Sequence, residues 1–290
     1  MSGSELTCPI PDVAVEADGE QCRAVFATAA DDCTACRGRE GSFGRDASGY
    51  EVFRPCSRRH ARRRIELYNT ARIGRRYAQA TFATYSPRNQ SQANAVETAR
   101  MWSSMYAAGQ ARGGLLFWGP VGTGKTHLVL SIFRELTLNA GIPARFVDYG
   151  NLLMDLRRSF RAEVGSSEAA LMMPLVETEV LIVDELGKGR NTEWELTVLD
   201  DLISRRYNAD RVTLFTTNHA VAGPKKKAGR GLNPGYDRRR ADASVGGGAE
   251  TLEERLDARI YSRLCEMCDF IRVDGEDFRR TGLAVSRRRP

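Results

Sequence analysis

Short apolar runs alternate with amphipathic stretches along the chain from residue 113 onward. The apolar runs have the length of buried strands, and the amphipathic stretches repeat apolar residues every three or four positions, as helices do. Alternation of this kind predicts an α/β fold in which a mostly parallel sheet carries helices on both faces. The predicted strands are Leu115–Trp118, Ala144–Tyr149, Val180–Asp184, Val212–Thr217 and Phe270–Val273, and helical patterns cover 126–138, 150–160, 192–207 and 251–267.

Two of these helices have clear start signals. Thr192 and Thr251 each precede a glutamate by three residues, which is the spacing of a capping box. In the helix predicted after Thr251, Arg255, Arg259 and Arg263 are four residues apart and are expected to share one face. That face is either a solvated surface paired with nearby acids or a set of guanidiniums presented to the triphosphate of a neighbouring subunit.

The other stretches differ in composition. Residues 1–30 carry little periodicity and look loosely ordered, whereas 61–110 read as mostly helical, with Ser91–Ala108 the clearest segment. Residues 220–250 are rich in Gly, Lys and Arg, and we expect them to form a mobile basic loop. The predicted parts are an N-terminal Cys/His-containing domain at 1–62, a helical linker at 63–110 and an α/β domain at 111–290.

Charge and composition narrow the class of protein. The formal net charge is +6 and the pI is about 9.0, a balance that favours polyanionic partners. No apolar run is long enough to cross a membrane, and the acidic, proline-containing N-terminus lacks the pattern of a signal peptide, so we expect a cytoplasmic protein without membrane contact. The arginine run Arg58–Arg64 is either a phosphate-binding surface or a solvated helix face.

The segment Gly119–Thr126 fits the pattern G-x-x-x-x-G-K-[ST] between a predicted strand and a predicted helix. Its glycines let successive backbone N–H groups face a phosphate chain, and the helix N-terminus adds positive charge. We therefore expect Lys125 to reach the β- and γ-phosphates and Thr126 to hold Mg²⁺. The predicted nucleotide-binding residues are Gly119, Pro120, Val121, Gly122, Thr123, Gly124, Lys125, Thr126 and His127, together with Asp184.

Polar side chains follow two further predicted strands. Asp184 and Glu185 end one apolar run, and Asn218 ends the next. Parallel strands deliver such residues to the edge of the sheet beside the phosphate loop. We expect Asp184 to complete the Mg²⁺ shell with Thr126, Glu185 to activate the attacking water, and Asn218 to contact the γ-phosphate or the water.

Four segments in this order, GPVGTGKTHL, LIVDELG, FTTN and LDARIYSRLCEMCDFIRVDGEDFR, resemble the AAA+ ATPases of the DnaC/DnaI helicase-loader group, which includes the IstB-type transposition helper ATPases. The resemblance covers about 70–290. It implies an AAA+ phosphate-loop core with a five-stranded parallel sheet and, as in loaders of this group, no C-terminal helical lid. The ligands implied are ATP and Mg²⁺.

The resemblance also implies roles for single residues. Lys125 and Glu185 match catalytic positions of the Walker motifs, and Asn218 matches sensor 1. Arg263 matches an arginine finger that acts on a neighbouring subunit, with Arg259 the second choice, so the implied assembly is a ring or spiral. The 150–160 helix falls where the group carries an insert that faces DNA. A sensor 2 arginine is not assigned, and Arg279 or Arg280 is the guess.

A separate cysteine and histidine pattern lies near the N-terminus. Cys33, Cys36, Cys56 and His60 form C-x2-C, nineteen residues, and C-x3-H, which could close a tetrahedral Zn²⁺ site, with Cys8 or Cys22 as substitutes for the second pair. Some DnaI-like loaders carry an N-terminal zinc-binding domain that contacts the helicase. By contrast, we expect Cys265 and Cys268 to be buried core thiols.

The function that these features favour is a DnaC/DnaI-like helicase loader that binds ATP and single-stranded DNA, oligomerises, and delivers a hexameric, DnaB-like replicative helicase. The alternative is an IstB-like helper ATPase that assembles on duplex DNA and recruits a transposase. A small-molecule kinase would gain nothing from the polar strand end at Asn218 or from the arginine helix. A binding module that does not hydrolyse ATP would not need Glu185.

Overall fold

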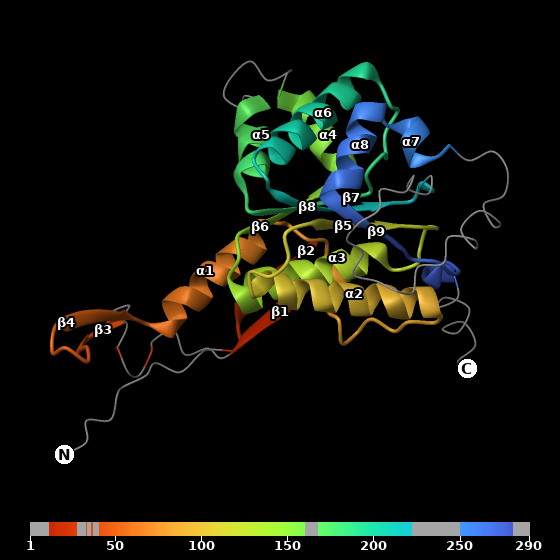
Figure 1. Ribbon diagram of the computed structural model, residues 1–290. Coiled ribbons are helices and arrows are strands. Elements are labelled where there is room, and N and C mark those ends of the chain that lie inside the picture. Colours follow the sequence, from red (N-terminus) through yellow and green to blue (C-terminus); the bar gives the residue numbers. More distant parts are fainter. Residues whose placement is uncertain are drawn as a thin grey trace, which may run out of the picture.

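The computed structural model describes residues 12–27, 33, 36, 41–159, 168–221 and 250–280 (Figure 1). Its centre is a five-stranded parallel sheet in the order β6-β7-β8-β5-β9. The strands are β5 (Gly114–Trp118), β6 (Ala144–Asp148), β7 (Val180–Asp184), β8 (Val212–Thr217) and β9 (Cys268–Arg272). The strand carrying the phosphate-loop motif, β5, lies between β8 and β9, so the predicted parallel sheet is confirmed.

One face of the sheet is covered by the helices that precede and follow β5. These are α2 (Gln90–Ala107), α3 (Lys125–Arg134) and its π-helical continuation η2 (Glu135–Ala140), with α1 (Ser57–Asn69) packed against η2. Alternate side chains of β5 and β7, such as Phe117 and Ile182, point into this layer and are fully buried. The phosphate-loop helix is therefore held between the sheet and α2 (Figure 1).

The opposite face carries the other helices. They are α4 (Tyr149–Ser159), α5 (Glu168–Glu177), α6 (Glu193–Asn208), α7 (Leu252–Arg255) and α8 (Ala258–Met267). Leu116, Leu181 and Phe215 of the sheet pack into this layer and are fully buried. Because β7 and β8 are buried on both faces, their sequences are almost continuously apolar or threonine-rich, as expected of central parallel strands.

Two antiparallel hairpins precede the sheet in sequence. The first, β1 (Val13–Asp18) with β2 (Gln21–Phe26), packs beside α1 and the short helix η1 (Arg75–Tyr77). The Asn69 side chain bonds both backbone groups of Ala24, at 2.7 and 3.1 Å, and the buried Cys22 thiol donates to the Gly74 carbonyl. Residues 12–27 are thus ordered, and the expectation of loose order there was wrong.

The second hairpin, β3 (Gly41–Arg45) with β4 (Glu51–Pro55), leads directly into α1. The hairpin and the first turns of α1 extend away from the sheet as an arm (Figure 1). We use the name arm for residues 41–64. The predicted boundary at 62/63 falls inside α1, and the three-part division of the chain stays a prediction.

Three further sequence predictions need comment. The 251–267 helix is broken, because Leu256 is extended and the Asp257 side chain caps α8 by accepting from the Arg259 N–H. Helix α5 was not predicted, since its apolar residues show no clear period. Most of the 220–250 segment lies outside the described residues. No helix in the described part of the chain is long and apolar enough to span a membrane.

Candidate nucleotide site

The loop between β5 and α3 is curled by glycines in left-handed conformations. Gly122 and Gly124 have φ angles of 78° and 96°. A Cβ at Gly122 would lie 1.9 Å from the Asp277 carboxylate, and one at Gly124 would lie 2.7 Å from the Tyr85 ring. Both positions therefore exclude side chains on conformational and steric grounds. The strand, turn and helix expected around the motif are present, and the exposed Pro120 and Val121 form the outer bend.

Lys125 is folded back onto the loop. Its Nζ donates to the carbonyls of Gly119 at 2.8 Å and Pro120 at 2.6 Å, and the side chain is buried. Burial lowers the pKa of Lys125 to about 8, against the raising effect of Asp184 and Glu185. The loop also closes on itself through the Thr123 hydroxyl, which donates to the Pro120 carbonyl. An ammonium therefore lies against the curled backbone where the motif predicts a phosphate chain.

Thr126, Asp184 and Thr216 form one hydrogen-bonded group. The Thr126 hydroxyl lies 3.1 Å from both Asp184 carboxylate oxygens, and the Thr216 hydroxyl lies 2.5 Å from Oδ1. Burial raises the pKa of Asp184 to about 6, helped by Glu185 and opposed by the two hydroxyl hydrogen bonds. A hydroxyl beside a buried carboxylate is a set of hard oxygen donors, which fits Mg²⁺.

Glu185 follows Asp184 in a left-handed conformation, with φ at 58°. Its N–H donates to the Thr216 hydroxyl at 2.9 Å, so Thr216 contacts both acids. The Glu185 carboxylate is ion-paired with Lys188, and this hydrogen bond raises the pKa of Lys188. The sequence analysis did not predict a role for Thr216 or Lys188. The two threonines that end the apolar strand β8 could have indicated Thr216.

The ends of β7 and β8 are joined by further hydrogen bonds. The Leu186 N–H donates to the Thr216 carbonyl at 2.7 Å, and the Thr217 hydroxyl donates to the Leu186 carbonyl at 2.8 Å. Asn218 is the next residue along the chain and is exposed at this sheet edge. The structure therefore brings Asn218 to the same edge as Asp184 and Glu185.

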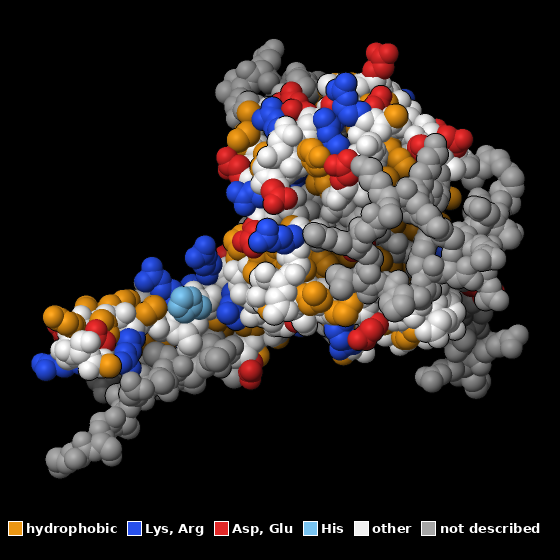
Figure 2. Space-filling model, in the orientation of Figure 1, with side chains coloured by type: hydrophobic (Ala, Val, Ile, Leu, Met, Phe, Trp, Pro, Cys, Tyr) orange, Lys and Arg blue, Asp and Glu red, His pale blue; other side chains and the backbone are white. Residues whose placement is uncertain are grey.

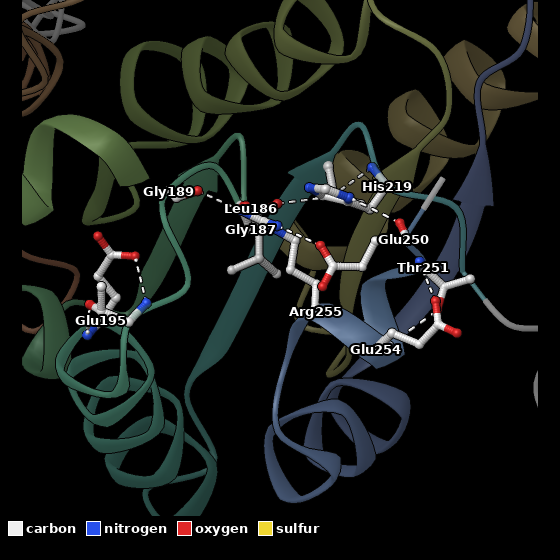
Figure 3. Close-up of polar contacts among 11 residues, drawn as sticks. Leu186, Gly187, Gly189, Glu195, His219, Glu250, Thr251, Glu254 and Arg255 are labelled. Atoms are coloured by element: carbon white, nitrogen blue, oxygen red, sulfur yellow. Dashed lines mark hydrogen bonds and ion pairs between the residues drawn. The ribbon is translucent and has the colours of Figure 1, made fainter. Parts of the chain in front are cut away.

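Arg255 is bonded within its own chain. Its guanidinium donates to the carbonyls of Gly187 and Gly189 and is ion-paired with Glu250 at 2.6 Å (Figure 3). Only 16% of its side chain is exposed. This arginine fastens the loop after Glu185 to α7, and it does not share a face with the arginines of α8, contrary to the prediction of one continuous helix.

Arg259 and Arg263 lie on α8 beside Asp200 of α6. The Arg263 guanidinium is 2.6 Å from Asp200 Oδ1 and 24% of its side chain is exposed, whereas Arg259 is 4.0 Å from Oδ2 and 70% exposed. Ser204 also donates to Asp200 Oδ1 at 3.2 Å. Both candidate finger arginines are therefore at the molecular surface, and Arg263 is the one held in a fixed direction.

Two segments border the phosphate loop from outside the sheet. Before α2, the Tyr85 hydroxyl donates to the Thr123 carbonyl, and the His127 ring contacts Tyr85 and the Thr81 carbonyl, which directs the His127 side chain to this segment. After β9, the Phe278 N–H donates to the Gly122 carbonyl at 3.0 Å.

The segment after β9 also carries charge to the loop. Arg279 contributes to lowering the pKa of Lys125. Arg279 is also ion-paired with Asp277, whose carboxylate borders Gly122 of the phosphate loop. Within the described residues, 273–280 contain no helical lid.

Cys33, Cys36 and Cys56 form a buried cluster where β4 meets α1, with their Sγ atoms all within 4.8 Å of one another. Two thiolates on one tetrahedral zinc ion lie about 3.8 Å apart, and three thiols already within 4.8 Å of one another could reach that spacing by small side-chain movements. His60 is exposed on α1 and does not join the group, and Cys22 bonds elsewhere. Of the other two thiols, Cys268 is buried as expected, whereas Cys265 is exposed.

The comparison with known families identifies the chain. The family model described as "IstB-like ATP binding protein" matches residues 29–226, well over half of the sequence. The chain belongs to the IstB-like ATP binding protein family. The family and the α/β fold class inferred from the motifs are therefore confirmed.

Proteins similar in sequence to this IstB-like chain include a replicative helicase loader. Replicative helicase loader DnaC of Escherichia coli (strain K12) is 27% identical over 151 residues, which is 52% of this chain and 60% of DnaC. Phage-like element PBSX protein XkdC of Bacillus subtilis (strain 168) is 24% identical over 203 residues, 66% of this chain and 73% of that protein. The match to DnaC thus spans less than two thirds of its length.

Among solved structures, one described as the crystal structure of the DnaC helicase loader is 27% identical and aligns with a TM-score of 0.53. The alignment covers 68% of this chain and 98% of the other. The IstB-like chain therefore contains the DnaC fold together with residues outside that alignment.

Proposed function

We propose that this IstB-like protein is a cytoplasmic, ATP-dependent helicase loader that binds single-stranded DNA, oligomerises and delivers a hexameric, DnaB-like replicative helicase. The observation that carries the enzymatic part is the Thr126–Asp184–Thr216–Glu185 group beside the phosphate loop. The likeness to DnaC supports the loading role. The proposed ATPase domain is 111–290.

In the proposed site, the backbone of Gly119–Thr126 cradles the phosphates of ATP, and Lys125 exchanges its two carbonyl partners for β- and γ-phosphate oxygens. Thr126 and Asp184 would hold Mg²⁺, which when bound neutralises phosphate charge. Burial of Asp184 keeps this carboxylate free of competing water until the ligand arrives.

Glu185 is the proposed general base for the attacking water. The Thr216 hydroxyl fixes its backbone, so the carboxylate can turn only about its side-chain bonds, from Lys188 toward the water. Asn218 at the adjacent strand end would hold the water or the γ-phosphate. Arg263, directed by Asp200, would reach the triphosphate of a neighbouring subunit, so that hydrolysis depends on assembly.

Cys33, Cys36 and Cys56 are the proposed protein ligands of a Zn²⁺ ion, and the fourth donor would come from outside this cluster. When bound, the ion would supply the cross-link that a hairpin of five-residue strands lacks. A zinc-stabilised N-terminal part favours the loader over the second candidate, an IstB-like helper that assembles on duplex DNA and recruits a transposase. The match to the IstB-like family model supports this second candidate.

The loading role is tested with a closed circle of single-stranded DNA, because a helicase ring cannot thread a closed circle unaided. Purified hexameric helicase is mixed with the circle, ATP and either wild type or Lys125→Ala, and circle-bound helicase is measured by gel filtration. We expect wild type alone to transfer the helicase. If wild type hydrolyses ATP but transfers no helicase and instead coats duplex DNA, the transposition helper is the better description.

A further inference from the structure

The arm exposes aromatic side chains that the nucleotide site does not use. Phe43 on β3 and Phe53 on β4 are cross-strand partners with ring centroids 5.3 Å apart, and they are 71% and 44% exposed. Arg45, two residues from Phe43, points to the same face of the hairpin. The edge-to-face pairing stabilises the hairpin modestly, and it leaves large parts of both rings open to a ligand.

Basic side chains continue from the hairpin along α1. Arg59, Arg62 and Arg63 are exposed, and among the described residues none of their guanidiniums has a hydrogen-bond or ion-pair partner. Their spacing of three and four residues places Arg62 and Arg63 beside Arg59 on the helix, about 5–6 Å from it. Figure 2 shows hydrophobic side chains over the hairpin and Lys or Arg side chains following them along α1 on one face of the arm.

We propose that the arm is a binding site for single-stranded nucleic acid, in which bases stack on Phe43 and Phe53 and the phosphates that follow are paired with Arg59, Arg62 and Arg63. This site is separate from the nucleotide site. It lies on the β3–β4 hairpin and the first turns of α1, which extend away from the sheet (Figure 1). It rests on the proposed binding of single-stranded DNA and adds the place where the strand is held.

Charge and ring geometry favour a strand over a protein partner. A protein that docks on two phenylalanines needs an apolar surface, but the exposed rings share the arm with Arg59, Arg62 and Arg63, whose guanidiniums have no acidic partner among the described residues. Aromatic rings followed by clustered positive charges match a polymer with one π-face and one negative charge per unit. In duplex DNA the bases are stacked on one another, so their faces are not available to stack on the two rings.

The test uses the full-length protein without ATP and measures fluorescence anisotropy of a labelled 20-residue oligo-dT strand and of a 20-base-pair duplex. The double variant Phe43→Leu/Phe53→Leu keeps apolar volume on the hairpin but removes the flat rings. We expect it to weaken strand binding at least about fivefold and to leave duplex binding unchanged.

A second pair of variants isolates the charges. Arg59→Ala/Arg62→Ala should reduce the slope of log affinity against log salt by about 1.4, which is two single-strand phosphate contacts. The matched control Arg205→Ala/Arg211→Ala removes two exposed arginines from the sheet domain and should leave the slope unchanged.

The proposal is overturned if the leucine and arginine arm variants bind the strand within twofold of wild type. It is also overturned in favour of a protein surface if Phe43→Ala/Phe53→Ala keeps strand affinity but loses binding to the purified hexameric helicase. ATP turnover is measured on the same samples. A wild type that binds the strand through the arm but never hydrolyses ATP would refute the proposed function and leave this site standing.

Discussion

The parallel sheet buries its central strands on both faces, whereas the β3–β4 hairpin leaves two phenylalanine rings in solvent. The sheet is stabilised by packing, and its polar groups at the carboxyl edge are bonded to one another through Thr216 and Asp184. The arm has too few residues to bury a core, and its buried thiol, Cys56, clusters with Cys33 and Cys36 in a group that fits a metal. We infer that the sheet performs the chemistry and that the arm makes contacts.

The largest expected effect is on turnover and concerns the sheet domain alone. Arg263→Ala should bind ATP normally and lose turnover by about 10³-fold, because a trans-acting guanidinium neutralises charge that grows as the γ-phosphate is transferred. Steady-state turnover and nucleotide affinity are measured together. The matched variant Arg259→Ala should lose less, since Arg259 is not directed by Asp200 at close range. The reverse order would make Arg259 the finger.

Loss of the metal should destabilise the arm and leave the sheet domain unaffected. In Cys56→Ser we expect bound zinc to fall from about one per chain to near zero and the arm amides to lose protection from hydrogen exchange, because the zinc cross-link provides most of the folding free energy of such small units. ATP turnover should stay within about twofold of wild type. Metal analysis and exchange mass spectrometry check both regions in one sample, and a sheet that also loses protection would show that they fold as one.

The pH dependence of the sheet site follows from Asp184. The raised pKa of about 6 means that the carboxyl is protonated below pH 6, and a protonated carboxyl cannot ligate Mg²⁺. The Mg²⁺ concentration for half-maximal turnover should therefore rise about tenfold for each pH unit below 6. Turnover titrated with Mg²⁺ from pH 5 to pH 8 measures this.

The same group has a consequence for stability. An acid whose pKa is raised on folding contributes stability below its unfolded pKa and loses that contribution as the pH rises through 6. Asp184→Asn should therefore raise the melting temperature of the nucleotide-free protein at pH 8 more than at pH 4.5. An equal shift at both pH values would contradict the assigned pKa.

The smallest effect concerns Lys188. Removing its ion pair in Lys188→Ala should free the Glu185 carboxylate and raise basal turnover about two- to fivefold, the range expected of a mostly exposed pair. Lys188→Arg keeps the pair and serves as the control. Lower turnover in the alanine variant would make Lys188 a contributor to catalysis instead.

The two regions also differ in how far the sequence predicted them. The five strands were predicted to within two residues at each end, and the loop from Gly119 to Thr126 was placed correctly, because buried parallel strands and phosphate loops have strong local patterns. The break at Asp257 was missed, since its capping of α8 competes with an unbroken apolar repeat. Neither Lys188 nor Asp200 belongs to a recognisable sequence motif. Lys188 pairs with Glu185 across a turn, and Asp200 of α6 pairs with Arg263 of α8.

Near the arm, the sequence predicted a cluster of Cys33, Cys36, Cys56 and His60, and the structure brings the three cysteines together. His60 follows Cys56 at a suitable spacing, yet α1 places it on the exposed side of the helix. The first hairpin was not predicted at all, because its strands carry only one and two buried residues and are held by Asn69 and the Gly74 backbone, which lie about fifty residues away. Contacts of that kind leave no local period in a sequence.

The central claim is that a neighbouring subunit completes the nucleotide pocket. Lys125→Ala lacks a working phosphate loop but keeps Arg263, and Arg263→Ala has the opposite defect. ATP turnover is measured for each variant alone and for an equimolar mixture of the two. We predict that neither variant turns over ATP alone and that the mixture does; a mixture as inactive as its components, or Arg263→Ala active by itself, would contradict the account.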